Sequence, residues 1–133
     1  MNIGETAKKA GINAKMIRHY ESVGVIPKAR RSSSGYRLYS EDDVQILTFV
    51  RRARSLGFSM VEIKKLVELW RNHSRTSADV KQLTVAHIKR LEQKISDLQD
   101  IRETLVSLAE SCHGDTNPSC PILEDISSAG SLS

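Results

Sequence analysis

Residues 3–24, IGETAKKAGINAKMIRHYESVG, decide the fold that the sequence predicts. Helix-forming residues extend from Ile3 to Ala10, and Gly11 then interrupts the helix. A second helical run begins at Asn13, a typical N-cap, and Gly24 is a typical stop signal. Two short helices joined by a tight turn at a glycine are the outline of a helix-turn-helix. The second helix has a packing side, formed by Met16, Ile17 and Tyr20, and an exposed side, formed by Lys15, Arg18 and His19.

A basic, serine-rich segment, KARRSSSGYRLYS, follows at residues 28–40. The alternation of Tyr36 and Leu38 predicts a loop that returns through a short strand and so forms a wing. A solvated basic loop is the alternative, and the neighbouring helix-turn-helix favours the wing. The arginines that a wing would make available to phosphates are Arg30, Arg31 and Arg37.

A second pair of helices is predicted after the wing. Ser40 and the acidic residues 41–43 cap the first helix, whose apolar side chains recur at helical spacing until it stops near Gly57. Ser59 begins the next helix, MVEIKKLVELWR. The arginines of the first helix either extend the basic surface or form a solvated face, and they are Arg51, Arg52 and Arg54.

One long helix is predicted from Ser77, because apolar side chains recur at spacings of three and four, with a one-residue slip near Arg102. A helix of roughly 30 residues, about 45 Å long, cannot cover its own apolar seam in a chain of this size. The simplest partner is a second copy, antiparallel or parallel, and packing on the chain's own N-terminal domain is the alternative. The seam residues that we expect at a dimer interface are Ile88, Leu91, Ile95, Leu98 and Leu105.

Charge is divided unevenly along the chain. Residues 1–75 hold 15 Lys and Arg against 7 Asp and Glu, whereas residues 76–133 hold 5 against 9. The N-terminal part is therefore a candidate for binding a polyanion, and the C-terminal part is not. There is no signal-peptide pattern, and no run approaches the roughly 18 apolar residues of a membrane span. We expect a cytoplasmic protein without a membrane partner.

The segment CHGDTNPSC, residues 112–120, contains the only two cysteines of the chain. In a reducing compartment such a pair is more often metal-binding or redox-active than a structural bridge. Thiolates are soft ligands that select Cu(I), Ag(I), Au(I), Zn(II) or Hg(II) over hard ions. The additional donors nearby are His113 and Asp115, whereas structural zinc almost always takes four ligands.

Binding by Cys112 and Cys120 alone would suit a monovalent d¹⁰ ion in linear geometry. Two thiolates on such an ion leave one negative charge to be stabilised. Backbone N–H groups of the loop, and the positive end of a short helix that starts near Pro121, could supply that stabilisation.

Three motifs in order, MIRHYE at 16–21, SGYRLY at 34–39 and ARSLGFS at 53–59, give the chain a close resemblance to the MerR family of bacterial transcription regulators. SADVK at 77–81 and CHGDTNPSCPIL at 112–123 further resemble the copper-efflux regulator (CueR-type) branch of that family. The resemblance covers the whole chain. It implies a mainly α fold, with a winged helix-turn-helix DNA-binding domain and a long dimerisation helix that forms an antiparallel coiled coil.

The resemblance implies a non-enzymatic regulator that binds palindromic promoter DNA as a homodimer and acts there on RNA polymerase. The effector-bound form of such a regulator bends and untwists the DNA until the promoter elements align. His19 stands where the family often has a tyrosine. The DNA-binding residues that the resemblance implies are Lys15, Arg18, Arg31, Tyr36, Arg37 and Arg54.

The resemblance also implies that Cys112 and Cys120 bind Cu(I), or its congeners Ag(I) and Au(I). Ser77 stands where the divalent-metal branches have a cysteine, so a third thiolate is absent. By resemblance, Ser77 and Phe58 roof the metal site, with ordinary core packing as the alternative for Phe58. Coordination by His113 stays open as a further alternative.

The predicted segments are a DNA-binding domain with the second helical pair (1–75), a dimerisation helix (76–111), a metal-binding loop with a short helix (112–127) and a flexible tail (128–133). Two other functions stay open. One is a thiol redox sensor, in which a reversible Cys112–Cys120 disulfide switches the same DNA-binding dimer. The other is a metal carrier or detoxifying enzyme, for which the sequence contains no second Cys/His pair, no nucleophile with a base at motif spacing and no phosphate loop.

Overall fold

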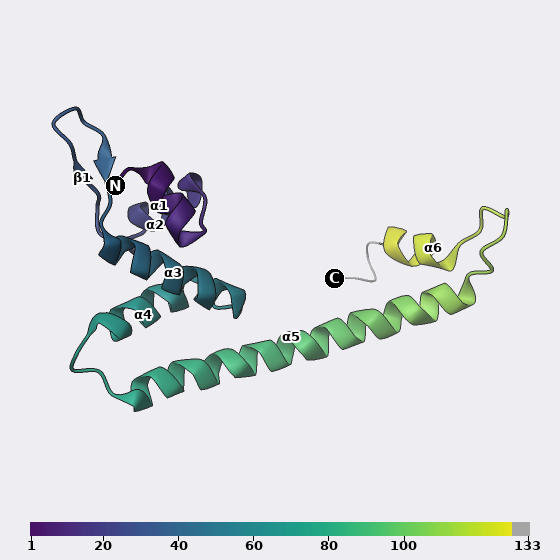
Figure 1. Cartoon of the computed structure of the whole chain (residues 1–133). Helices are drawn as coiled ribbons and strands as arrows, with labels where there is room; N and C mark the ends of the chain where they lie inside the picture. Colours follow the sequence, from purple (N-terminus) through teal and green to yellow (C-terminus); the bar gives the residue numbers. More distant parts are fainter. Residues whose placement is uncertain (129–133) are drawn as a thin grey trace. The chain divides into compact units, whose positions relative to one another are not determined.

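The computed structural model describes residues 1–128, and the last five positions of the predicted tail lie outside the described residues. The chain is mainly helical, as predicted, with one small hairpin (Figure 1). Within residues 1–128, no helix combines the length and the apolar character that crossing a membrane requires. The elements are α1 (Ile3–Ala10), α2 (Ala14–Ser22), β1 (Arg30–Arg31), β2 (Arg37–Leu38), α3 (Glu41–Ser55), α4 (Met60–Arg71), α5 (Ser77–Ser111) and α6 (Pro121–Ser127).

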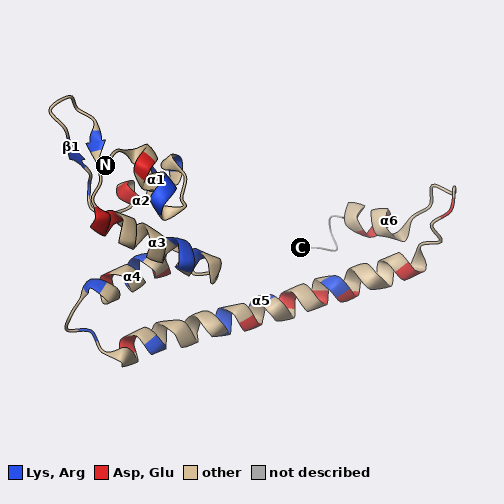
Figure 2. Cartoon of the chain, in the orientation of Figure 1, with Lys and Arg blue, Asp and Glu red and all other residues tan. Residues whose placement is uncertain are grey.

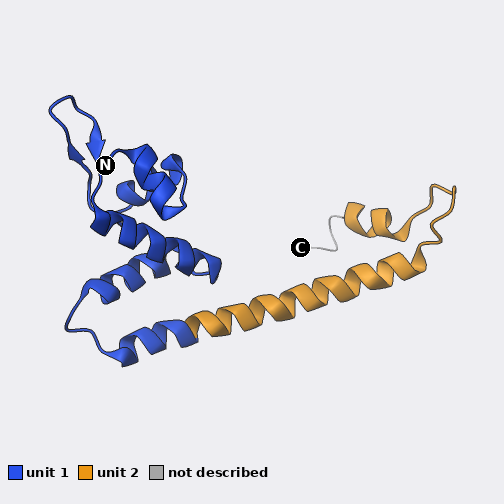
Figure 3. Cartoon of the chain, viewed as in Figure 1, with its two compact units in different colours: residues 1–85 blue, residues 86–133 orange. Residues whose placement is uncertain are grey.

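Two compact units divide the chain at the third turn of α5 (Figure 3). Unit 1 contains Met1–Val85, and unit 2 begins at Ala86. The buried apolar residues that form the hydrophobic core all lie between Ala10 and Val67, inside unit 1. The predicted functional segments 1–75, 76–111 and 112–127 stay a prediction.

The helix-turn-helix of α1 and α2 is set by short-range hydrogen bonds. Asn2 caps α1, and Asn13 caps α2 by accepting a hydrogen bond of 2.8 Å from the backbone N–H of Met16. Gly11 ends α1 in the left-handed conformation, with φ of 70°, which a residue without a Cβ adopts most readily. The α2 helix ends at Ser22, two residues before the predicted stop at Gly24.

The wing is a short antiparallel hairpin in which Arg30 pairs with Leu38 and Arg31 with Arg37. Its turn is closed by a hydrogen bond of 2.9 Å from the Gly35 N–H to the Ser32 carbonyl. The base of the wing is tied to the start of the chain, because the Tyr39 N–H donates to the carbonyl of Met1 at 2.8 Å. The predicted wing is confirmed, with strands of only two residues each.

The second helical pair, α3 and α4, packs on the first through the buried face of α3. Both helices start with a capping box, Ser40 with Asp43 and Ser59 with Glu62, where each side chain satisfies a backbone N–H of the other residue. The rings of Phe49 and Trp70 stack with their centroids 4.5 Å apart, an aromatic contact between the two helices. The core side chains of α3 are Val44, Ile46, Leu47, Val50 and Ala53.

The α5 helix is 35 residues long, which corresponds to about 52 Å at a rise of 1.5 Å per residue. Its start is the one that the sequence predicts, at Ser77. Of its 35 residues, His87 alone is buried. Large apolar side chains of α5 are instead exposed to solvent in the single chain, and they are Val85, Ile88, Ile95, Leu98, Ile101, Leu105 and Val106.

Candidate nucleic-acid interface and thiol centre

The first candidate site is a hollow of about 620 Å³ in unit 1, lined by residues of α2, the wing and the N-terminus. It brings together four of the six side chains that the sequence predicts to bind DNA, Arg18 from α2 and Arg31, Tyr36 and Arg37 from the wing. Figure 2 shows positive residues on both strands of the wing, on α1 and at the C-terminal end of α3. Lys15 is exposed on α2 but does not line this hollow.

The side chains of the wing are partly held in place. Arg31 donates through Nη1 to the carbonyl of Gly35 at 2.9 Å, which ties the arginine to the turn of the wing. Arg37 forms a longer ion pair of 3.7 Å with Glu21 at the end of α2. Tyr36 is 73 % exposed, so its ring is available to an incoming ligand.

Glu21 joins α2 to the base of the wing. Its carboxylate accepts a hydrogen bond of 3.2 Å from the hydroxyl of Tyr39, and it also faces Arg37. Burial raises the pKa of Tyr39, and the negative charge of Glu21 raises it further, so the hydroxyl stays protonated and remains a donor. This link could not be predicted from the sequence, because Glu21 and Tyr39 are 18 residues apart and no local pattern connects them.

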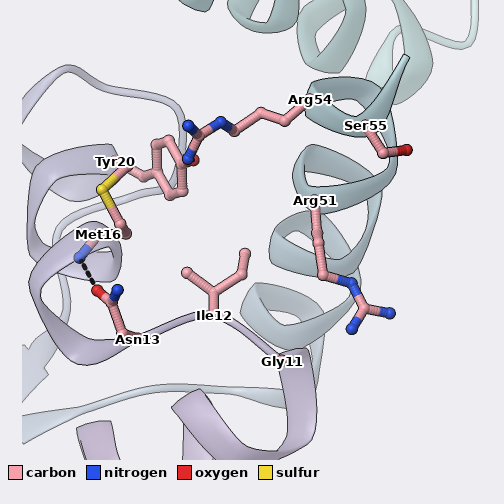
Figure 4. A pocket seen from close by; sticks show the side chains of 8 residues that line it. All are labelled: Gly11, Ile12, Asn13, Met16, Tyr20, Arg51, Arg54 and Ser55. Atoms are coloured by element: carbon pink, nitrogen blue, oxygen red, sulfur yellow. Dashed lines mark hydrogen bonds between the residues drawn. The ribbon is translucent and has the colours of Figure 1, made fainter. Parts of the chain in front are cut away.

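The sixth predicted DNA-binding residue, Arg54, lies at a second hollow of about 380 Å³ (Figure 4). Asn13, Met16 and Tyr20 line one side of it from the turn and α2, and Arg51 and Arg54 line the other from α3. Nη1 of Arg54 donates to the hydroxyl of Tyr20 at 2.9 Å. From the sequence, Tyr20 is expected only to pack, and a tyrosine rather than a phenylalanine at a packing position was the available signal for a polar contact.

The thiol centre lies in unit 2, in the loop between α5 and α6. The Sγ atoms of Cys112 and Cys120 are 3.8 Å apart, and both are free, half-buried thiols. The loop is shaped by two successive Asx turns, in which the Asn117 N–H donates to Asp115 at 2.9 Å and the Ser119 N–H donates to Asn117 at 3.0 Å. The loop that brings the two sulfurs together is thus shaped by its own local hydrogen bonds.

The environment of Cys120 favours its thiolate. The pKa of Cys120 is lowered mainly by the backbone N–H of Leu123, and also by the backbone N–H of Ile122 and by the Cys112 thiol. Burial has the opposite effect and raises this pKa. The Cys120 side chain does not cap α6. We therefore attribute the lowered pKa of Cys120 to the nearby backbone amides of Leu123 and Ile122. The nucleophilic and metal-binding form of the thiol is thus stabilised.

The sulfur pair fits a soft metal ion. With metal–sulfur bonds of about 2.3 Å, two sulfurs on a linearly coordinated ion lie about 4.6 Å apart, so the metal-free separation of 3.8 Å would have to widen by roughly 0.8 Å. Within residues 1–128, no group of three His, Cys, Asp or Glu side chains lies close enough together to hold a metal. The two thiols are therefore the donors that the loop itself brings together.

The remaining predicted site residues lie in different parts of the chain. Ser77 is the first residue of α5 and lines a hollow of about 560 Å³ with His73, Arg75 and Lys81. Phe58 is half-buried and packs against the core of unit 1. Both belong to unit 1, and their predicted role above the metal site stays a prediction. The predicted dimer-interface residues Ile88, Ile95, Leu98 and Leu105 are exposed in the single chain, and Leu91 is half-buried.

Two protein-family descriptions match the chain. The family described as "MerR HTH family regulatory protein" matches residues 1–69, and the one described as "MerR, DNA binding" matches residues 44–108. The chain is 52 % identical over 130 residues to the HTH-type transcriptional regulator HmrR of Sinorhizobium medicae (strain WSM419), covering 98 % of this chain and 88 % of that protein. It is 43 % identical over 127 residues to the HTH-type transcriptional regulator CueR of Salmonella typhimurium (strain LT2), covering 96 % of this chain and 92 % of that protein.

A solved structure extends the likeness to three dimensions. The transcription regulator PbrR691 from Ralstonia metallidurans CH34, in complex with lead(II), superposes with a TM-score of 0.81 at 35 % sequence identity. The match covers 95 % of this chain and 98 % of that one. The sequence motifs, the fold and the relatives agree, and the chain belongs to the MerR family of helix-turn-helix regulatory proteins.

Proposed function

We propose that the chain is a metal-responsive transcription activator of the copper-efflux type, which binds promoter DNA as a homodimer and detects Cu(I), or Ag(I) or Au(I), through Cys112 and Cys120. The observation that carries this proposal is the pair of free thiols, 3.8 Å apart, at the end of a long helix in a MerR-family chain. Copper is proposed from the resemblance of residues 77–81 and 112–123 to the copper-efflux branch.

The number of thiolates is the argument for a monovalent ion. Two thiolates on a monovalent ion leave a single negative charge, and the amides of Leu123 and Ile122 already favour a thiolate at Cys120. A divalent ion would need further ligands, and by the family resemblance Ser77 stands where the divalent-metal branches have a cysteine as a third thiolate. A bound ion would supply a fixed link between the end of α5 and the start of α6. The related structure of PbrR691 contains lead(II), a divalent ion, so the fold alone does not select a monovalent ion. The selection that we propose depends on the number and type of donor atoms.

The DNA side of the proposal rests on unit 1. Residues 1–85 hold 16 Lys and Arg against 8 Asp and Glu, and four of the predicted contact residues line one hollow between α2 and the wing. Arginines in such a hollow can bind phosphate oxygens, while α2 is exposed for contact with base edges. The exposed apolar seam of α5 supports dimerisation, since a second copy could cover it.

The proposal is tested by transcription in vitro from a promoter that the wild-type protein selects from genomic DNA, under strict reduction, with RNA polymerase and one equivalent of Cu(I). We expect Cu(I) to activate the wild type and to leave Cys112→Ser inactive, although that variant still binds the promoter. Ser111→Ala, which alters the adjacent residue but keeps both thiols, is the matched control. Activation by Cu(I) in Cys112→Ser would contradict the proposed metal site.

The disulfide alternative is separated by the same assay. A redox switch would respond to an oxidant without metal and would give an oxidised chain with an intramolecular Cys112–Cys120 bond. In that case the two sulfurs would have to approach from 3.8 Å to the roughly 2.05 Å of a disulfide. Activation by diamide in the absence of Cu(I), with no response to Cu(I) under reduction, would favour the alternative.

A further inference from the structure

The hydroxyl of Tyr20 has a partner that the packing role of the ring does not explain. Tyr20 is fully buried, with 0 % of its surface exposed, and its ring belongs to the core of unit 1. A phenylalanine would fill most of the same space, so the ring alone does not require a hydroxyl. That hydroxyl accepts a hydrogen bond of 2.9 Å from Nη1 of Arg54, whose residue is exposed. The contact thus joins a buried point of the core to an exposed cation.

Arg54 is held by a neutral hydroxyl, whereas two other arginines of unit 1 face carboxylates. Arg71 is paired with Asp42 through two hydrogen bonds, and Arg37 faces Glu21. Among residues 1–128, Arg54 is not part of any ion pair. A hydroxyl acceptor fixes the direction of a guanidinium without neutralising its charge, and the remaining N–H groups stay available to an external anion.

The hollow beside Arg54 has the chemistry of an anion site. Its lining contains two arginines, Arg51 and Arg54, and no carboxylate. Figure 4 shows Tyr20 on one wall and the two arginines on α3 across from it. The hollow opens next to the turn before α2, so an anion there would lie beside the helix that presents Lys15 and Arg18.

We propose that Tyr20 is a positioning residue for DNA binding, whose hydroxyl holds the Arg54 guanidinium over this hollow to receive a backbone phosphate of the duplex. The inference rests on the proposed function, since it needs DNA as the ligand of unit 1. It adds a buried residue to the residues that support DNA binding. It also gives the adjacent residues Tyr20 and Glu21 the same role, which is to orient an arginine. Each of the two contacts one arginine that flanks α2, Arg54 on α3 and Arg37 on the wing.

The test is a double-mutant cycle on DNA affinity. A fluorescein-labelled duplex, selected by the wild-type protein from a random-sequence pool, is titrated with wild type, Tyr20→Phe, Arg54→Ala and the double variant. We expect Tyr20→Phe to weaken binding about three- to tenfold, the range for the loss of one typical hydrogen bond, and to have no effect in the Arg54→Ala background. An equal loss in both backgrounds, or no loss in the wild-type background, would overturn the inference.

The salt dependence of binding provides a readout that a purely structural role would not change. Each phosphate contact that is lost reduces the slope of log K against log salt by about 0.9. We expect Tyr20→Phe to reduce the slope towards that of Arg54→Ala, whereas a slope equal to that of the wild type would contradict the proposal. Thr48→Val, which removes a hydroxyl of α3 that donates to the Val44 carbonyl at 2.8 Å, is the matched control and should keep both slope and affinity.

Failure of the inference can be distinguished from failure of the proposed function. If the wild type selects no duplex, DNA binding itself is wrong and the inference falls with it. If the wild type binds and Arg54→Ala binds equally well, the proposed function stands and the positioning role is wrong. Thermal unfolding of Tyr20→Phe, followed by circular dichroism, confirms that the affinities refer to folded protein.

Discussion

The two units of the chain differ in where their stability resides. Unit 1 encloses a core of buried apolar residues and carries 16 Lys and Arg against 8 Asp and Glu. In the described part of unit 2, residues 86–128, only His87 is buried, and the whole unit holds 4 Lys and Arg against 8 Asp and Glu. Unit 1 therefore encloses a core of its own, whereas large apolar side chains of unit 2 are exposed in the single chain.

This difference matches the two roles that we propose along one chain. The basic unit presents arginines at hollows suited to phosphates, and the acidic unit presents two thiols. The α5 helix belongs to both units and is the continuous element between them. Changes in unit 1 should therefore alter folding and DNA binding, and changes in unit 2 should alter assembly and metal response.

The largest effect is expected from a cavity in the core of unit 1. Leu47 is fully buried, and Leu47→Ala should lower the free energy of unfolding by about 2–5 kcal/mol, because it loses buried surface and leaves a cavity. Urea denaturation followed by circular dichroism measures the change. Val61→Ala, at an exposed apolar position of α4, is the control and should change stability little. Equal losses in the two variants would contradict the core described for unit 1.

The corresponding change in unit 2 should act on assembly. Leu98 is 63 % exposed in the single chain, and Leu98→Asp would place a charge in the predicted seam. We expect the dimer dissociation constant to rise about 100-fold, because a charge buried without a partner is costly. Sedimentation equilibrium measures it, with Gln99→Asp on the neighbouring face as the control. A dimer that tolerates Leu98→Asp would place the interface elsewhere.

A smaller effect is expected at the capping box of α4. Ser59→Ala should cost about 1 kcal/mol of stability, because the Glu62 N–H loses its acceptor at the helix start. Ser59→Asp, which restores an acceptor, should recover most of the loss in the same urea titration. The α6 helix of unit 2 has no side-chain cap, so Cys120→Ala should not show an equivalent capping loss in metal-free protein at a pH where Cys120 is a neutral thiol.

The smallest effect concerns the protonation of Cys120. Its pKa is lowered in the folded protein, so the thiolate should form at lower pH there than in urea-unfolded chain. Because the folded pKa lies below the unfolded one, the thiolate stabilises the fold at pH above the unfolded pKa, and this contribution is lost as the pH falls through the folded pKa. The rate of iodoacetamide alkylation against pH, in Cys112→Ser, measures the shift. Coincident folded and unfolded curves would contradict the role of the α6 amides.

Much of unit 1 could be predicted from the sequence, because its helices are bounded by local signals. Asn13 and Ser59 cap the helices where the sequence places them, and Gly11 ends α1. The contact of Tyr20 with Arg54 could not be predicted, since it joins residues 34 positions apart whose approach depends on the packing of α2 against α3. The same reason hides the link between Glu21 and Tyr39.

Unit 2 shows the opposite pattern. The cysteine pair and the seam are evident from spacing, and the two Asx turns could have been found in the Asp115, Asn117 and Ser119 pattern. The partner that we propose for the seam is a second copy, and neither periodicity nor the fold of one copy identifies it. The choice among Cu(I), Ag(I) and Au(I) depends on metal–sulfur bonding and not on the pattern of residues.

X-ray absorption on the reduced protein, loaded with one Cu(I) per chain, tests the central claim that Cys112 and Cys120 alone bind the effector. We predict two short copper–sulfur distances with no nitrogen scatterer, and loss of this spectrum in Cys112→Ser. His113→Ala should leave the spectrum unchanged. A third scatterer that disappears in His113→Ala, or a spectrum without sulfur, would contradict the two-thiolate site.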